Sequence, residues 1–436
     1  MELGKHLGKG IWGLADKALP VIYGLGYVIL VIRVLPEEEF GNFVLLQEIF
    51  LIISGLATAF ALQPLLKYAA EDRTDIAGVI TVAFWFNLAF VAVASALVVA
   101  LSVPAGVLLH SPSLPPLLVY VPAMLAASFV RNFTLILLQA RFRIREVFWV
   151  DAAHFIGAPF LVWVYSRMHL FDSAMDLVVI NVISLFASSI VGLLLSWRLM
   201  RWRMRPKAED RKKMWEYGTY SLGGIASYLV YSKADTFILA AFTGPFQVAV
   251  YNSAKVFTRV FDMITQMVQM FVLPAVSRLS SQGDHPRLKA LVEKAILFST
   301  VIMIPVLLVF LLGPGLLIEV LYSGRYAGAI PILQIFALLS LVVPLLAVGS
   351  NTLMGLGHAR INFVLGLQML LVSIAAYVIF IPPFAGVGAA IGYVIASYVM
   401  AWMTTVRLKR EVPLSLRGVL RRGNDIRMFV RQRLSL

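Results

Sequence analysis

The sequence of 436 residues contains no cysteine and few charged side chains. Without cysteine the chain can form no disulfide, no thiolate metal site and no thiol nucleophile. Only 14% of the residues are charged, whereas 60% are hydrophobic, and the mean hydropathy is +0.86. Soluble domains carry about 25% charged residues, so the composition excludes a soluble enzyme. It predicts an all-α polytopic membrane protein.

The N-terminal residues also lack the unbroken apolar core of a cleavable signal peptide, because Lys5, Lys9 and Asp16 interrupt it. We therefore expect residues 1–17 to form an amphipathic cytoplasmic segment and the first span to direct insertion.

Long apolar segments recur along the chain, and a membrane-spanning helix needs about 20 such residues. Twelve segments meet this requirement, six in each half of the sequence. The predicted spans cover residues 18–35, 40–63, 76–103, 117–140, 147–165, 175–197, 217–242, 246–273, 295–318, 331–355, 361–381 and 388–406.

The chain has 37 lysine and arginine residues and a formal net charge of +14. With twelve spans, most of these basic residues fall on the side of the two termini. The opposite side has only Arg33, Arg167 and Arg325. The positive-inside rule then predicts a multi-pass protein with both termini in the cytoplasm. The positive charge therefore indicates topology, and we expect no nucleic-acid binding.

The chain looks duplicated about a basic cytoplasmic linker at 198–216, which separates an N-lobe (18–197) from a C-lobe (217–406). A tight outer turn follows the first span of each lobe, at 35–43 and at 243–251. An even number of spans separates the copies, so the two six-helix lobes form a parallel repeat. Residues 407–436 form a basic tail, in which we expect an amphipathic helix on the inner leaflet.

Short motifs carry a family resemblance: the turn Pro36–Phe43, Ala234-Asp235, and Gly244-Pro245 followed by Tyr251-Asn-Ser-Ala254. They resemble the Wzx-type polysaccharide flippases of the multidrug/oligosaccharidyl-lipid/polysaccharide (MOP) transporter superfamily. The resemblance implies a MATE-like fold with two lobes around a central cavity. It also implies translocation of an undecaprenyl-diphosphate-linked oligosaccharide, such as an O-antigen precursor, across a bacterial or archaeal plasma (inner) membrane by alternating access.

Two features depart from the pattern of the superfamily. The first turn has Leu35-Pro36-Glu37 in place of Gly-Pro. Asp16 lies at the inner end of the first span, so we expect no buried carboxylate there. The acidic centre that resembles an ion-coupling site in many drug exporters is therefore not evident.

The segment 246–273 contains a polar stripe, which we call the span-eight stripe. Its members recur every three or four residues and so share one helix face: Asn252, Lys255, Arg259, Asp262, Gln266 and Gln269. Such a face is costly in lipid, so it predicts a wet cationic wall on which Arg259 binds the diphosphate. The alternative is a set of interhelical pairs, for example Arg259 with Asp262.

Other basic residues are weaker candidates for substrate binding. Arg131 lies deep in the segment 117–140, and this position favours a role in a cavity. Arg33 could contact a substrate phosphate or extend to the outer interface. Lys233 and Asp235 point in different directions because they are two residues apart. We expect Asp235 to meet Lys255 or Arg259 across the helices.

The buried carboxylates are candidates for ion coupling or pairing. Asp151 and His154 stand one turn apart and could relay a proton, although a local hydrogen bond near the inner interface is favoured. Counted over all spans, four cations balance four anions: Arg131, Lys233, Lys255 and Arg259 against Glu48, Asp151, Asp235 and Asp262. A cationic cavity therefore requires Asp151 and Glu48 to face elsewhere.

Other function classes remain as alternatives. A MATE-like small-molecule exporter would favour exposed carboxylates and aromatics over a cationic wall. A non-transporting subunit of a polysaccharide-synthesis complex is a further alternative. An integral-membrane polymerase would need a sizeable outer loop, and the outer loops here are short. We expect no enzyme activity, cofactor or metal. The expected partners are the lipid-linked glycan, membrane lipids and possible polymerase or assembly proteins.

Overall fold

The computed structural model describes residues 2–71, 76–168 and 170–423, and every regular element in these ranges is a helix. Nine of the described helices are long and apolar enough to cross a membrane, or ten when the pair bent by 47° at residue 338 counts as one span. The prediction of an all-helical membrane protein is confirmed. The chain divides into two compact units, Met1–Asn252 and Ser253–Leu436.

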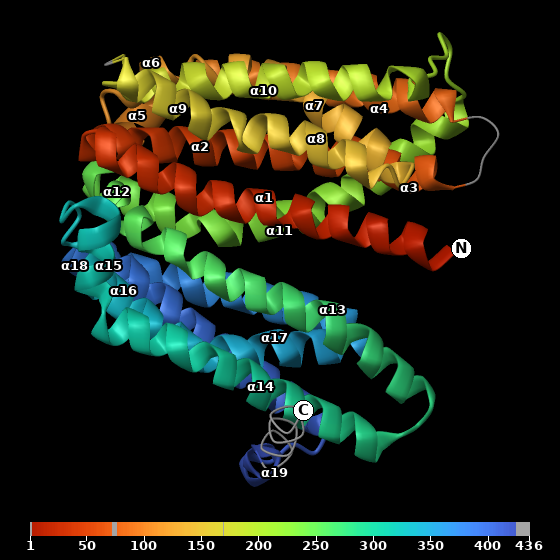
Figure 1. Ribbon diagram of the computed structural model, residues 1–436, viewed down its shortest axis with the longest axis vertical. Coiled ribbons are helices and arrows are strands. Elements are labelled where there is room, and N and C mark those ends of the chain that lie inside the picture. Colours follow the sequence, from red (N-terminus) through yellow and green to blue (C-terminus); the bar gives the residue numbers. More distant parts are fainter. Residues whose placement is uncertain (1, 72–75, 169, 424–436) are drawn as a thin grey trace. The chain divides into compact units, whose positions relative to one another are not determined.

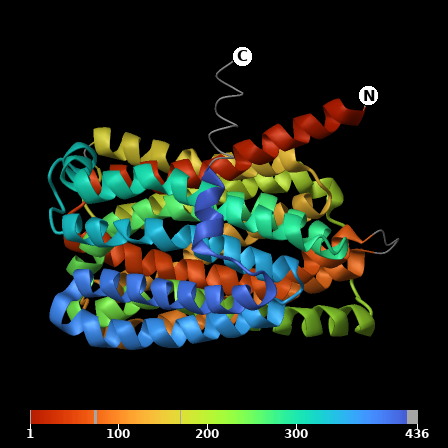
Figure 2. The same ribbon diagram turned by 90° about the horizontal axis from the view of Figure 1, so that it is seen from below.

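The N-terminal unit consists of long helices that run alongside one another (Figures 1 and 2). A π-helical turn, Thr58–Leu62, joins α2 to α3, and a 3-10 turn, Trp197–Leu199, follows α10. The helices are α1 (Glu2–Val34), α2 (Glu37–Ala57), α3 (Gln63–Ala70), α4 (Ala77–Ala100), α5 (Ser102–Leu108), α6 (Leu114–Leu118), α7 (Val121–Ala140), α8 (Ile144–Phe155), α9 (Gly157–Arg167), α10 (Ala174–Ser196), α11 (Ala208–Thr243) and α12 (Pro245–Lys255), whose last turn enters the second unit.

The C-terminal unit is built on α13, α14 and α17, which pack against one another. Its helices are α13 (Arg259–Ser281), α14 (His285–Leu312), α15 (Pro314–Tyr322), α16 (Ala329–Ala337), α17 (Leu339–Gly355), α18 (Ala359–Glu411) and α19 (Leu416–Arg421). Phe261, Ile264, Val268, Val272 and Val276 recur at helical spacing on α13 and are all buried. This apolar face holds α13 against its neighbours.

The twelve predicted spans each overlap a described helix, although three of them do so in unexpected ways. The helix α11 covers 217–242 but is not among the candidates of sufficient apolarity, because the predicted span itself contains Lys233 and Asp235 together with several glycine, serine and tyrosine residues. The helix α18 covers both 361–381 and 388–406, and it breaks at Ala385, where φ is 48° and ψ is −128°. The division of the spans into an N-lobe (18–197) and a C-lobe (217–406) stays a prediction.

The two outer turns that suggested a duplication meet inside the N-terminal unit. Gly244 has a φ of 77°, a conformation that favours glycine, and it ends α11 so that Pro245 can begin α12. A Cβ atom at Gly41 would lie 1.9 Å from the Pro245 carbonyl oxygen. Only a glycine lets α2 approach α12 this closely. Beside this contact, Ser111 Oγ donates to Asn42 Oδ1 at 2.5 Å.

Candidate functional site

A buried polar network lies between α7, α8 and α10 of the N-terminal unit. Arg131 on α7 forms an ion pair with Asp151 on α8, and their side chains are 12% and 13% exposed. The Arg131 Nε atom also donates to Ser188 Oγ at 3.1 Å, and its Nη1 atom donates to Asn132 Oδ1 at 3.2 Å. Arg131 is therefore engaged within the unit, with Asp151 as its counter-ion.

His154, which the sequence predicted beside Asp151 as a candidate for ion coupling, lies on α8 next to this network. It is buried, and its Nδ1 atom lies 3.0 Å from Ser184 Oγ on α10. One turn earlier on α10, Asn181 Nδ2 donates to the Tyr27 hydroxyl at 2.9 Å. Asp151 and His154 thus have partners on other helices, and the choice between a local hydrogen bond and a proton relay stays a prediction.

The expectation that the first span holds no buried carboxylate is wrong. Asp16 is only 8% exposed, and its Oδ1 atom makes no hydrogen bond among the described residues. It interacts electrostatically with both Arg131 and Asp151. The reason is that α1 is one continuous helix from Glu2 to Val34 that packs along α8, so the inner end of the span is covered by protein.

Two further acidic residues of the N-terminal unit have partners on neighbouring helices. Glu48 on α2 forms an ion pair with Lys233 on α11 at 2.5 Å. Asp235 accepts a hydrogen bond from the Tyr251 hydroxyl at 2.6 Å and one from the Thr236 backbone at 2.7 Å. Lys233 and Asp235 thus face different partners, as their spacing indicates. Contact of Asp235 with Lys255 or Arg259 stays a prediction.

The span-eight stripe was predicted on one continuous helix, but its residues lie on two helices, α12 and α13. A 3-10 turn, Val256–Thr258, separates the two helices, and Arg259 begins α13 directly after it. Lys255 and Arg259 are half-buried, whereas Asp262, Gln266 and Gln269 are exposed. The apolar face of α13 packs inside its unit. Asn252 donates from its side-chain amide to the Val248 carbonyl at 3.1 Å.

Arg33 lies in the last turn of α1 and is exposed. This position is compatible with both predicted roles, contact with a phosphate and extension to the outer interface. The structure therefore brings Arg131, Asp151 and His154 together and pairs Glu48 with Lys233. It leaves the role of Arg33 a prediction.

Sequence reasoning did not single out the polar side of α10. Asn181, Ser184 and Ser188 recur at helical spacing and are all buried, and they supply the partners of Tyr27, His154 and Arg131. The spacing of three and four residues in an apolar span was the signal that could have revealed them.

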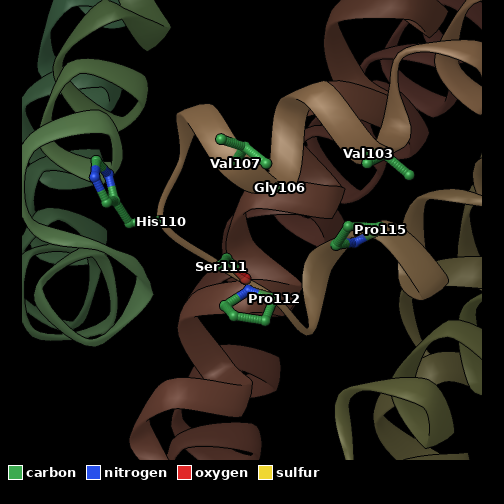
Figure 3. A pocket seen from close by; sticks show the side chains of 7 residues that line it. All are labelled: Val103, Gly106, Val107, His110, Ser111, Pro112 and Pro115. Atoms are coloured by element: carbon green, nitrogen blue, oxygen red, sulfur yellow. The ribbon is translucent and has the colours of Figure 1, made fainter.

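A separate pocket of about 420 Å³ lies in the N-terminal unit, where α5 and α6 form a short hairpin (Figure 3). Its walls are mostly apolar, with Val103, Val107 and Pro115 among them, and His110 lies at its edge. None of the predicted site residues lines it. Among the residues that the structure describes, no group of three or more acidic or histidine side chains is arranged to hold a metal ion.

The helical architecture defines the class of protein. The chain superposes on the lipid II flippase MurJ in an inward closed conformation with a TM-score of 0.74, at 12% identity, over 94% of this chain and 89% of that one. It superposes on an inward-facing multidrug resistance MATE family transporter of the MOP superfamily with a TM-score of 0.72, at 16% identity, over 92% and 98%. The protein therefore has the MATE-like fold that the sequence predicted.

A sequence family can be assigned as well, because a family model described as polysaccharide biosynthesis protein matches residues 30–331. The chain belongs to this family. An uncharacterized membrane protein of Methanocaldococcus jannaschii is 28% identical over 194 residues, 43% of this chain and 38% of that protein. The probable low-salt glycan biosynthesis flippase Agl15 of Haloferax volcanii is 22% identical over 234 residues, 53% and 49%. The chain thus matches less than half of the length of either relative.

Proposed function

We propose that the protein is a flippase that moves a lipid-linked oligosaccharide from the inner to the outer leaflet of a plasma membrane. The observation that carries the proposal is the family match over residues 30–331, which runs from the end of α1 into α16. The MATE-like fold supports transport, and the name of the Haloferax relative links it to flipping in glycan biosynthesis. The finer proposal is an undecaprenyl-diphosphate carrier with a cell-surface polysaccharide unit, such as an O-antigen precursor.

The span-eight stripe supplies suitable chemistry for such a substrate. A guanidinium group binds phosphate oxygens through two parallel hydrogen bonds, so Arg259 is the proposed diphosphate ligand and Lys255 a second positive charge. Gln266 and Gln269 are exposed amides on the same helix, and amides can bond sugar hydroxyls as donors or acceptors. The lipid tail would remain in the bilayer while the head group crosses.

Arg131 and Lys233 fit this role less well, because each is already paired with a carboxylate inside the N-terminal unit. Asp151 and Glu48 each pair with a cation of the N-terminal unit, which supports a cationic stripe by the charge count. Transport further requires that the substrate bind the inward and outward states differently. We infer alternating access between two six-helix lobes, with both termini in the cytoplasm.

The test is translocation of a fluorescent lipid-diphosphate-linked oligosaccharide in proteoliposomes, at matched protein incorporation. We expect Arg259→Ala and Lys255→Ala to slow translocation about tenfold or more, which corresponds to the loss of one charged hydrogen bond of about 1.4 kcal/mol or more. Arg259→Lys keeps the charge but lacks the planar guanidinium group, so its translocation rate should lie between those of the wild type and Arg259→Ala. Arg407→Ala removes an exposed cation from the end of α18 and serves as the control.

The outcomes separate the alternatives. If Arg259→Ala translocates as fast as the wild type, the stripe does not bind the phosphate. If folded wild-type protein moves no lipid-linked glycan under any imposed ion gradient, the flippase proposal fails. Transport of small cationic drugs under the same gradients would then favour a MATE-like exporter, and the absence of both activities a non-transporting subunit. The proposal involves no bond formation or cleavage, so intact substrate must be recovered from the outer leaflet.

A further inference from the structure

The basic linker contains a segment without regular helix that is nevertheless fixed to the N-terminal unit. We call residues 200–207 the linker strap; it joins the 3-10 turn after α10 to α11. The Trp202 ring stacks on Phe133 of α7, with ring centroids 6.2 Å apart and planes at 6°, and it meets Phe84 of α4 edge-on at 5.1 Å. The neighbouring Arg203 backbone N–H donates to Thr81 Oγ1 at 2.9 Å.

These contacts hold the strap across helices of the N-terminal core. Phe133 is itself part of the buried apolar cluster formed by the π-turn, α3, α4 and α7. The Thr81 hydroxyl also donates to the Ala77 carbonyl in the first turns of α4. The backbone on both sides of Trp202 is thus fixed at the ends of membrane helices, and the side chains that point outward are held in a defined arrangement.

Those outward side chains are strongly basic. Arg201, Arg205 and Lys207 are exposed, and the structure gives them no ion pair among the residues it describes. On α11, Lys212 lies 3.9 Å from Glu216 and Lys213 pairs with Glu209, whereas Arg211 before them is exposed. The positive charge that no carboxylate balances therefore lies on the strap and at the beginning of α11.

Exposed apolar side chains accompany these charges. Met204 is 101% exposed between two arginines, and Trp197 just before the strap is 60% exposed. Tryptophan at the end of a membrane helix is typical of the head-group level of a bilayer. A soluble anion or a nucleic acid would not favour an exposed methionine and tryptophan beside the cations, whereas a lipid offers phosphate and hydrocarbon at neighbouring depths.

We propose that the linker strap is a binding site for the head group of an anionic phospholipid. Arg201, Arg205 and Lys207 contact the phosphate and its neighbours, while Trp197 and Met204 enter the boundary between head groups and acyl chains. Because Trp202 and Arg203 fix the backbone, little conformational entropy is lost when the lipid binds. The site is independent of the glycan, and bound lipid would hold the beginning of α11 at the membrane surface.

The experiment measures lipid retention by the full-length protein in detergent, titrated with phosphatidylglycerol or phosphatidylcholine and analysed by native mass spectrometry. We expect the wild type to retain phosphatidylglycerol in preference to phosphatidylcholine. Each basic residue near a lipid surface adds to the attraction of anionic lipid, so the triple variant Arg201→Gln, Arg205→Gln, Lys207→Gln should weaken phosphatidylglycerol binding about a hundredfold.

Two controls separate a fixed site from charge in general. The triple variant Arg407→Gln, Lys409→Gln, Arg410→Gln removes the same charge from the end of α18, where all three side chains are exposed, and should bind phosphatidylglycerol like the wild type. Trp202→Ala keeps every charge but releases the strap, and it should lower binding severalfold, whereas Trp202→Phe should bind nearly as the wild type does.

The proposal is overturned if the two triple variants lose phosphatidylglycerol equally, because the net charge of the protein would then explain retention. Wild-type binding by a folded Trp202→Ala variant would overturn it too, since the fixed backbone would be irrelevant. If Trp202→Ala does not fold, Thr81→Val removes the acceptor of the Arg203 N–H group and provides the same test. No glycan is present, so the result does not depend on the proposed flippase activity.

Discussion

Polar groups are used differently inside the N-terminal unit and along α13 of the C-terminal unit. In the first, Arg131, Asp151 and His154 are buried or nearly so and bonded to neighbouring helices. On α13, Gln266 and Gln269 are exposed on the same side as Met267 and Met270, whereas the helix face from Phe261 to Val276 is buried. Both regions look alike in sequence, as polar residues in an apolar span. The first group holds helices together, whereas the second forms part of the stripe that we propose as the substrate site.

The physical reason is the cost of burying a charge. A buried ion is tolerated when a counter-ion and hydrogen bonds replace its water, and Arg131 has both. Glu293 on α14 of the C-terminal unit is a comparable case, because its side chain is 2% exposed and accepts a hydrogen bond from Arg422 Nε at 3.1 Å. That pair lies beside α19 and far along the chain from the span-eight stripe.

The largest expected effect comes from breaking the buried pair. Asp151→Ala leaves Arg131 without its counter-ion in an environment of low polarity. Loss of one partner of a buried ion pair costs about 3–5 kcal/mol, so we expect a marked fall in the free energy of unfolding. Denaturant unfolding in detergent micelles measures it.

The double variant Arg131→Met, Asp151→Leu provides the control, because it removes both charges and retains apolar volume. It should be more stable than Asp151→Ala. Equal stability of Asp151→Ala and the wild type would contradict the assignment of this pair to the packing of the unit and would reopen a substrate role for Arg131.

A second expected effect concerns the close approach of α2 and α12. In Gly41→Ala the added Cβ would lie 1.9 Å from the Pro245 carbonyl oxygen, so the two helices must separate. Overpacking of this kind costs about 1–3 kcal/mol.

The matched control is Gly223→Ala on α11, where nothing lies within 4 Å of the new atom. We expect that change to be neutral or slightly stabilising, since alanine favours helix. Thermal unfolding of both variants decides the matter, and an equal response would rule out the close contact.

Much of the fold could be predicted from the sequence, because hydrophobic length and basic loops are local signals. All twelve predicted spans overlap helices, and the turn at Gly244-Pro245 begins a helix as expected. The pairing of Arg131 with Asp151 could not be predicted, since it depends on how α7 and α8 rotate against each other. Asp16 was misjudged for a similar reason: its burial depends on α1 packing along α8, which no pattern within the first span reveals. The predicted amphipathic tail residues Ile426, Phe429, Val430 and Leu434 lie outside the described residues.

The smallest expected change in stability is also the one that most sharply separates the two regions. Gln269→Ala alters an exposed side chain on α13, so the free energy of unfolding should change by less than about 0.5 kcal/mol. If the amide binds a sugar hydroxyl, its loss removes about 0.5–1.5 kcal/mol of substrate interaction, and translocation should slow roughly two- to tenfold. Met270→Ala, next to it and 67% exposed, should leave both quantities unchanged. A variant that is fully stable yet slow places function on the exposed face, whereas unchanged translocation by Gln269→Ala would confine the substrate contacts to the part of the stripe near Arg259.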